Sequence, residues 1–215
     1  MKSYCVIGLG NFGQAIARSL LESGKQVMII DIDPVKVNAL ADIVTDAVIG
    51  DATSETFLKE SGIKNYDCAI NCLYKELNDS IMVTLLLKEF GIKKIVARAG
   101  SVRQKDVLDK LGADMVVFPE YDMGMRLGEV LVRKNVHDYI EIYDGYCFVE
   151  LDVPGKWLGK NLIQLQLRKK FGLTIVAVRT GNGEIFVSPD PERPFEKGDE
   201  ISVIGKNKDI DKLTV

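Results

Sequence analysis

The chain has 215 residues, of which 47% are hydrophobic and 27% charged, with a formal net charge of −3. This composition excludes a disordered chain, and its mixed charges lack the basic stripe of a nucleic-acid-binding protein. No apolar run approaches the roughly 20 residues that cross a bilayer, and residues 1–15 lack a signal peptide. We therefore expect a cytoplasmic protein with one medium-sized and one small domain, no nucleic-acid partner and no direct membrane insertion.

The first predicted element is a short strand, Tyr4–Ile7, that leads directly into the pattern Gly8-x-Gly10-x-x-Gly13 and then an amphipathic helix. In this setting Gly8 allows a sharp turn, and Gly10 lets the backbone approach a pyrophosphate. Gly13 lets the new helix lie tightly on the sheet. Free N–H groups at the helix start, together with the positive end of the helix dipole, favour a bound phosphate.

A second strand, Gln26–Ile30, ends at Asp31, about 20 residues beyond the glycines. A carboxylate at this position can accept hydrogen bonds from both ribose hydroxyls. Asp33 follows Asp31 closely, and no arginine stands nearby. The extra 2′-phosphate of NADP would therefore meet negative charge. The pattern indicates nucleotide binding. The alternative is a Rossmann unit that no longer binds a nucleotide and serves only as a scaffold.

Strands alternate with helices through the rest of the first half, which predicts a parallel, doubly wound, Rossmann-like sheet. The predicted helices are Pro34–Leu40, Ser54–Ser61, Asn78–Phe90 and Ser101–Leu111, and the predicted strands are Ala47–Ile49, Cys68–Cys72, Lys94–Ala99 and Met115–Phe118. A ligand of such a sheet lies at the carboxyl ends of its strands. The polar residues at or just past those ends are Asp31, Asp51, Asn71, Arg98 and Glu120.

The pattern changes after Pro119. Residues 120–134 predict one helix, and from Tyr139 onward the composition favours β-structure. The predicted elements there are strands Tyr146–Val153, Leu173–Arg179, Glu184–Ser188 and Glu200–Gly205, a helix Leu162–Lys170, and a hairpin turn at Gly181-Asn182-Gly183. We therefore expect a Rossmann domain at 1–119, a connecting helix at 120–135 and a small α+β domain at 136–215.

The four cysteines, Cys5, Cys68, Cys72 and Cys147, fall mostly in apolar strand segments. We interpret them as buried core residues in a reducing compartment. The spacing of Cys68 and Cys72 is not that of a CxxC zinc or redox pair. A single histidine, His137, argues against a Ser-His-Asp triad and against a two-histidine metal site.

Several segments together resemble the RCK family (regulators of conductance of potassium, with TrkA-N and TrkA-C domains), and within it the single-unit Ktr subunits. These segments are Val6–Gly13, Asp31, Gly50–Thr53, Thr84–Glu89, Lys110–Asp114 and Pro119–Gly124, followed by a half of TrkA-C type. The resemblance extends over essentially the whole chain. It implies a cytoplasmic gating subunit of a bacterial potassium transporter.

The resemblance implies a regulatory nucleotide, ATP or ADP, or alternatively NAD or NADH. The residues expected to bind it are Gly8, Gly10, Asn11, Phe12, Gly13, Asp31, Asp51, Ala52, Asn71 and Arg98. Asp51 and Ala52 match the segment beside the adenine, and Arg98 matches a base near the phosphates. The alternatives are that Asp51 caps the following helix and that Arg98 forms an ion pair without a ligand.

Glu120 matches a carboxylate that in Ktr subunits helps to hold a divalent cation, Mg²⁺ or Ca²⁺, near a dimer interface. The alternative is an acid favoured at a helix start. Asn11 stands where many Ktr subunits have an arginine that reaches a neighbour's phosphates. Its absence removes a charge-assisted contact of about 1.5–3 kcal/mol. The preference for ATP over ADP, or over NAD, is therefore left open.

The resemblance also implies a homodimer through the helix at 120–135, assembled into a ring, usually of eight subunits, beneath a membrane channel or transporter. Met123, Leu127 and Leu131 would then face a partner; the alternative is that they pack on their own sheet. Several relatives bind cyclic di-AMP in the C-terminal domain. Arg168-Lys169-Lys170 is a candidate for that anion, with a solvated cationic helix end as the alternative.

The expected function is thus regulatory and not enzymatic: nucleotide occupancy changes the shape of a ring that is peripheral to the inner face of the membrane. The alternative from another class is an NAD-dependent oxidoreductase, which needs an acid or base near the nicotinamide. A redox-sensing DNA-binding repressor would need a helix-turn-helix and a basic face, which the sequence lacks.

Overall fold

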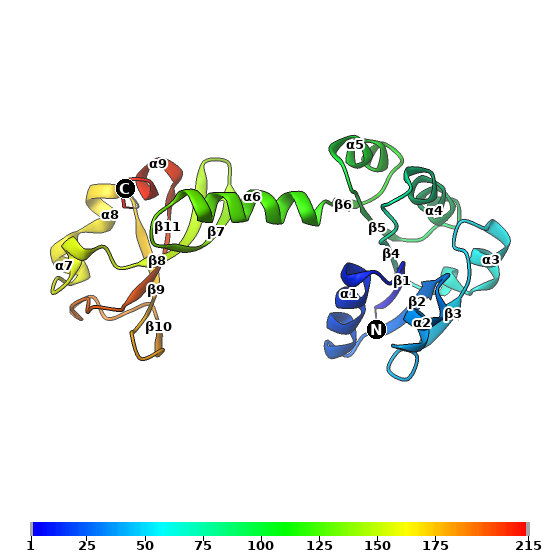
Figure 1. Ribbon diagram of the computed structural model, residues 1–215, viewed down its shortest axis with the longest axis horizontal. Coiled ribbons are helices and arrows are strands. Elements are labelled where there is room, and N and C mark those ends of the chain that lie inside the picture. Colours follow the sequence, from blue (N-terminus) through cyan, green and yellow to red (C-terminus); the bar gives the residue numbers. More distant parts are fainter. Residues whose placement is uncertain (1, 214–215) are drawn as a thin grey trace. The chain divides into compact units, whose positions relative to one another are not determined.

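The computed structural model describes residues 2–213, which form two compact units, Met1–Glu120 and Tyr121–Val215 (Figure 1). The first unit contains a six-stranded sheet in the order β3-β2-β1-β4-β5-β6, with every pair parallel. The predicted Rossmann-like architecture is confirmed. Its strands are β1 Ser3–Ile7, β2 Gln26–Asp31, β3 Asp46–Ile49, β4 Cys68–Asn71, β5 Lys94–Arg98 and β6 Met115–Val117.

The central strand β1 is buried on both faces, because helices cover both sides of the sheet. Side chains alternate along it, so that Ile7 belongs to one hydrophobic cluster and Val6 to the other. The strand order runs in opposite directions from β1 and β4, which places the crevice of the sheet at the carboxyl ends of these two strands.

The helices of this unit are α1 Asn11–Glu22, α2 Pro34–Asn38, α3 Glu55–Glu60, α4 Leu77–Glu89 and α5 Val102–Lys110, with a short 3₁₀ turn η1 at Ile63–Asn65. Asp33 caps α2, since it accepts a hydrogen bond from the Val35 N–H at 2.9 Å. At α5, the Ser101 side chain accepts from the Gln104 N–H, and the Gln104 side chain accepts from the Gly100 N–H.

The second unit contains a five-stranded antiparallel sheet in the order β10-β9-β11-β8-β7. Its strands are β7 Val136–Tyr143, β8 Tyr146–Asp152, β9 Thr174–Arg179, β10 Ile185–Val187 and β11 Glu200–Lys206. Its helical segments are η2 Gly155–Trp157, α7 Leu162–Leu165, α8 Leu167–Phe171 and α9 Asn207–Ile210. Helix α6, Pro119–Val132, begins at the end of the first unit and continues into the second. The hairpin of β9 and β10 is confirmed. The single helix predicted over 162–170 was wrong, because Gln166 (φ +50°) breaks it into α7 and α8.

The core of the second unit lies on one face of its sheet. Alternate residues of β8, Cys147, Val149 and Leu151, point into it, and the Trp157 and Phe195 rings stack with centroids 6.3 Å apart. All four cysteines are buried and free, which confirms their interpretation as core residues.

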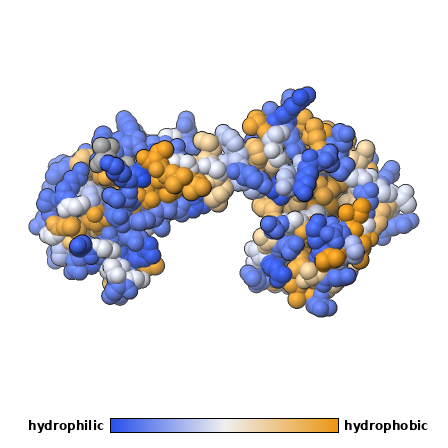
Figure 2. Space-filling view, in the orientation of Figure 1, coloured by the Kyte–Doolittle hydropathy of each residue, from blue (hydrophilic) through white to orange (hydrophobic). Residues whose placement is uncertain are grey.

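Helix α6 has no buried residue over its range, which lies wholly within the described chain. Met123, Leu127 and Leu131 are 57%, 54% and 74% exposed, so packing on their own sheet, the alternative considered above, was wrong. Figure 2 shows hydrophobic side chains of α6 at the visible surface. Over residues 2–213, no helix has both the length and the apolar character needed to cross a membrane.

Candidate nucleotide-binding site

The glycine loop between β1 and α1 requires glycine at two positions. Gly8 has φ +90°, a left-handed conformation that side chains rarely adopt, and a Cβ there would lie 2.9 Å from Leu73 Cδ2. A Cβ on Gly13 would lie 2.0 Å from the Gly8 carbonyl oxygen, so only glycine lets α1 approach the loop this closely. The roles expected for both residues in shaping the loop are confirmed, whereas their contact with a ligand stays a prediction.

The start of α1 combines two features in a way that none of the helices α2–α5 shares. Side chains cap α2, α3 and α5, whereas α1 (N-cap Gly10) and α4 (N-cap Glu76) have no side-chain cap among residues 2–213, and of these two only α4 has an acidic residue, Asp79, in its first turn. The first turn of α1 thus lacks acidic residues, and a Cβ on Gly10 would meet no described atom within 4 Å. N–H groups at an uncapped helix start bind anions well. Asn11 and Phe12 are the first two residues of this turn.

Asp31, at the end of β2, lies directly beside the loop. Its Oδ2 accepts a hydrogen bond from the Leu9 N–H at 2.5 Å, and its Oδ1 accepts from the Asp33 N–H at 2.9 Å. Lys36 Nζ lies 3.9 Å from Oδ1. The carboxylate is 9% exposed and therefore holds the loop against the end of β2, in addition to any contact with a ribose.

Asp51 and Ala52 follow β3. Asp51 is exposed and accepts hydrogen bonds from the N–H and hydroxyl of Thr53, at 2.9 and 2.7 Å. The alternative that Asp51 caps the next helix was wrong, because the Ser54 side chain caps α3. Ala52 is 5% exposed and packs in the hydrophobic core.

Asn71, at the end of β4, is fully buried. Its side-chain amide donates to the Ser80 carbonyl at 2.9 Å and to the Thr84 hydroxyl at 3.1 Å, and its Oδ1 accepts from the Leu73 N–H. These bonds tie the start of α4 to the carboxyl end of β4. Asn71 therefore shapes the crevice from beneath it.

Arg98, at the end of β5, joins two predicted site residues that are distant in sequence. Its guanidinium lies 5.1 Å from the ring centroid of Phe12 and pairs with Glu120 at the start of α6. The guanidinium also lies 3.7 Å from the ring centroid of Tyr74. Tyr74 is not among the predicted site residues, although it follows the carboxyl end of β4. Arg98 is 6% exposed, and its Nε has no hydrogen-bond partner within residues 2–213. The cation is thus held at the crevice with one donor unused.

A separate basic hollow of about 580 Å³ lies in the second unit. Lys156, Lys160 and Lys170 line it together with Trp157 and Phe171. Only Lys170 of the predicted Arg168-Lys169-Lys170 segment takes part. All three residues of that segment also lie in the last turn of α8, where cations interact favourably with the helix dipole.

Comparison with known proteins decides the family. The TrkA-N domain model matches residues 4–119 and the TrkA-C domain model matches residues 148–214. The Ktr system potassium uptake protein C of Bacillus subtilis is 40% identical over 212 residues, covering 99% of this chain and 96% of that protein. The chain belongs to the RCK family, with TrkA-N and TrkA-C domains.

The solved structures agree with this RCK assignment at the level of fold. The GsuK channel matches with a TM-score of 0.71 and 18% identity, over 99% of this chain and 39% of that chain. The Kef CTD of Shewanella denitrificans, in an AMP-bound form, matches with a TM-score of 0.52 and 26% identity, over 61% of this chain and 80% of that chain. The resemblance derived from the sequence motifs is confirmed.

Proposed function

We propose that this RCK protein is a nucleotide-sensing regulatory subunit of a bacterial potassium uptake system. It acts at the cytoplasmic face of the membrane through a channel or transporter subunit and catalyses no reaction. Its relationship over nearly its whole length to a Ktr potassium uptake protein supports this proposal. Nucleotides with different affinities for two shapes of the assembly shift the population between them.

The observation that carries the nucleotide part of the proposal is the uncapped start of α1 at Gly10, with Asp31 beside the same loop. The free N–H groups of this turn match a phosphate chain, and the Asp31 oxygens retain lone pairs for ribose hydroxyls. The ligand is an adenine nucleotide, ATP or ADP, with NAD or NADH as the second choice. The AMP-bound Kef CTD, similar in its fold and in 26% of aligned residues, supports an adenine nucleotide.

Arg98 is the cation that meets the phosphates. Its unused Nε is a buried donor that an anion in the crevice would satisfy. Glu120 is the proposed ligand of a divalent ion, but its pairing with Arg98 weakens its attraction for a cation, because the guanidinium already neutralises the carboxylate. Mg²⁺ or Ca²⁺ would bind Glu120 together with oxygen ligands from the nucleotide or a second subunit, since one carboxylate does not make a cation site.

The exposed apolar residues of α6 support assembly through this helix into a homodimer, and of dimers into an octameric ring. In this proposal residues 1–119 bind nucleotide, residues 120–135 form the dimer contact, and residues 136–215 form the regulatory C-terminal domain. The basic hollow lined by Lys156, Lys160 and Lys170 is the candidate for cyclic di-AMP, because its lysines would face phosphates and the partly exposed Phe171 would face a base.

Ligand titration tests the proposal. Purified protein is heated with ATP, ADP, NADH or cyclic di-AMP, and a bound ligand raises the unfolding temperature by mass action, with about 2.7 kcal/mol of stabilisation at a hundredfold excess over Kd. We expect at least one adenine nucleotide to stabilise the chain and NADH to remain unoxidised with common oxo acids. Indifference to every nucleotide, or steady turnover of NADH, would overturn the proposal.

A further inference from the structure

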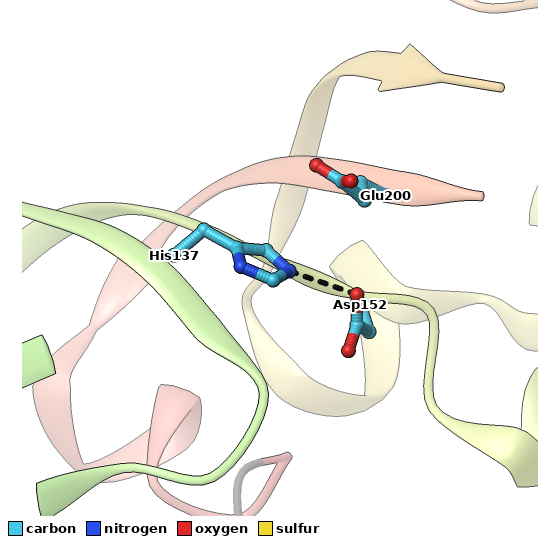
Figure 3. A group of neighbouring side chains, drawn as sticks. All are labelled: His137, Asp152 and Glu200. Carbon is cyan, nitrogen blue, oxygen red and sulfur yellow. Dashed lines mark hydrogen bonds and ion pairs between the residues drawn. The ribbon is translucent and has the colours of Figure 1, made fainter. Parts of the chain in front are cut away.

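The C-terminal sheet carries one group of side chains that the nucleotide site does not use. His137 of β7, Asp152 of β8 and Glu200 of β11 bring one potential ligand atom each to within 4.8 Å of one another. His137 Nε2 lies 2.8 Å from Asp152 Oδ1 (Figure 3). We propose that this group is a binding site for a divalent transition-metal ion, with zinc as the ion that it fits best.

The strand register brings the three side chains together. Glu200 lies directly opposite Asp152 in the antiparallel pairing of β11 with β8. The pairing of β7 with β8 shifts between Val136 and Asp138, so His137 is the extra residue of a β-bulge. A bulge redirects a side chain, and here the imidazole points toward the two carboxylates, as Figure 3 shows.

The charges at this position favour a cation. Two carboxylates directly opposite each other on neighbouring strands repel, which destabilises a sheet unless positive charge compensates. On the far side of Glu200, Arg179 of β9 pairs with Glu200 Oε2 and compensates one of them. Glu200 can keep this pair through one oxygen and offer the other to an ion. Asp152 has the His137 imidazole as its neighbour.

The ligand set selects the type of ion. Mg²⁺ and Ca²⁺ prefer oxygen ligands only, whereas an imidazole nitrogen with carboxylates suits zinc and its neighbours in the first transition series. Around a tetrahedral zinc ion, ligand atoms about 2.0 Å from the metal lie about 3.3 Å from one another. Partly exposed side chains reach this spacing by small rotations, and water fills the fourth position. The metal would bind the neutral ring through Nε2, and the single ring proton would then lie on Nδ1.

The chain offers an unusually clear readout, because His137 is its only histidine. The experiment uses the full chain without a histidine tag. Zinc is titrated while the imidazole ¹H–¹⁵N correlations are recorded, and the affinity is measured by calorimetry. We expect the single imidazole to shift with zinc, and to remain unmoved by Mg²⁺ at the same concentration. An unmoved imidazole with zinc, or an equal response to Mg²⁺, would overturn the proposal without the need for any variant.

Variants test the imidazole and one of the two carboxylates. His137→Gln and Glu200→Gln should each weaken zinc binding by roughly tenfold or more. The matched control is Glu150→Gln, which removes the same charge two residues from Asp152 on β8 and outside the group. It should change the affinity by less than about twofold. An equal loss in Glu150→Gln would mean that zinc senses only the negative surface, and the proposal would be wrong.

Discussion

Asp31 accepts a hydrogen bond from the Leu9 backbone N–H, and this bond joins the end of β2 to the glycine loop that follows β1. The residue with the strongest sequence signal for ribose binding is therefore also a structural support of the phosphate loop. Its two possible contributions, to folding and to ligand binding, can be separated experimentally.

Asp31→Ala removes the acceptor of two backbone N–H groups, those of Leu9 and Asp33. We expect the free energy of unfolding to fall by about 1–3 kcal/mol and the nucleotide-dependent rise in unfolding temperature to disappear. The control is Asp33→Ala, which removes the cap of α2 and costs about 1 kcal/mol but should keep the nucleotide response. A full response in Asp31→Ala would contradict the assigned role.

Alanine should destabilise the protein much more at position 13 than at position 10. In Gly13→Ala the new Cβ overlaps the Gly8 carbonyl, so we expect a loss of about 1–3 kcal/mol in the free energy of unfolding. In Gly10→Ala the Cβ enters open space, so the loss should stay below about 1 kcal/mol, while nucleotide binding weakens. Urea unfolding and ligand titration measure the two effects. Equal destabilisation by both changes would show that the loop relaxes.

Arg98 and Glu120 should be energetically coupled. The Arg98 side chain is 7% exposed, whereas solvent screens the 54% exposed Glu120 side chain, so a double-mutant cycle with Arg98→Met and Glu120→Gln should give a coupling of at most about 1 kcal/mol in unfolding experiments. The matched control is the surface pair Lys105 and Asp109, which are 46% and 49% exposed. Coupling in the first cycle no larger than in the second would mean that this half-buried pair contributes little.

Asn11→Arg should raise the affinity for ATP more than that for NADH. Asn11 is the first residue of α1, at the uncapped helix start, and a cation there adds a charge-assisted contact of about 1.5–3 kcal/mol to the more highly charged ligand. Calorimetry of both ligands measures the difference. Asn11→Met, which has no charge, should leave the ratio of affinities unchanged. Equal gains for ATP and NADH in the arginine variant would count against phosphates at this turn.

The buried thiols should resist modification. Burial raises the pKa of Cys72 to about 12 and that of Cys147 to about 11, from the ordinary 9.0. In the unfolded chain these groups ionise near 9.0, so the free energy of unfolding should decrease as the pH rises above that value toward the folded-state pKa values. At pH 8 a thiol reagent should react slowly with the native protein and fully in denaturant. Rapid reaction of one native thiol would contradict its burial.

The sequence predicted the first unit well because its signals are local. A strand, three spaced glycines and a helix determine the loop, and the alternation that follows leaves few topologies open. The positions of polar residues at strand ends were also predictable, but their orientation was not. Asn71 has the right place in the sequence, yet long-range bonds to Ser80 and Thr84 turn it into the protein.

The second unit was harder to predict because its pattern is interrupted. Strand β7 was missed, since the bulge at His137 breaks the two-residue alternation that marks a strand. The break between α7 and α8 depends on a left-handed Gln166, a conformation that composition does not signal. The group of His137, Asp152 and Glu200 could not be predicted either, because only the register of three strands brings these residues together.

The pairing of Arg98 with Glu120 has a mechanical consequence. The same guanidinium faces Phe12 in the first turn of α1 and the Glu120 carboxylate at the start of α6. In the proposed site, an anion at the Arg98 Nε would share this cation with Glu120, so the strength of either contact would depend on the other. The charge of the bound ligand would then act directly on the contact at the start of α6.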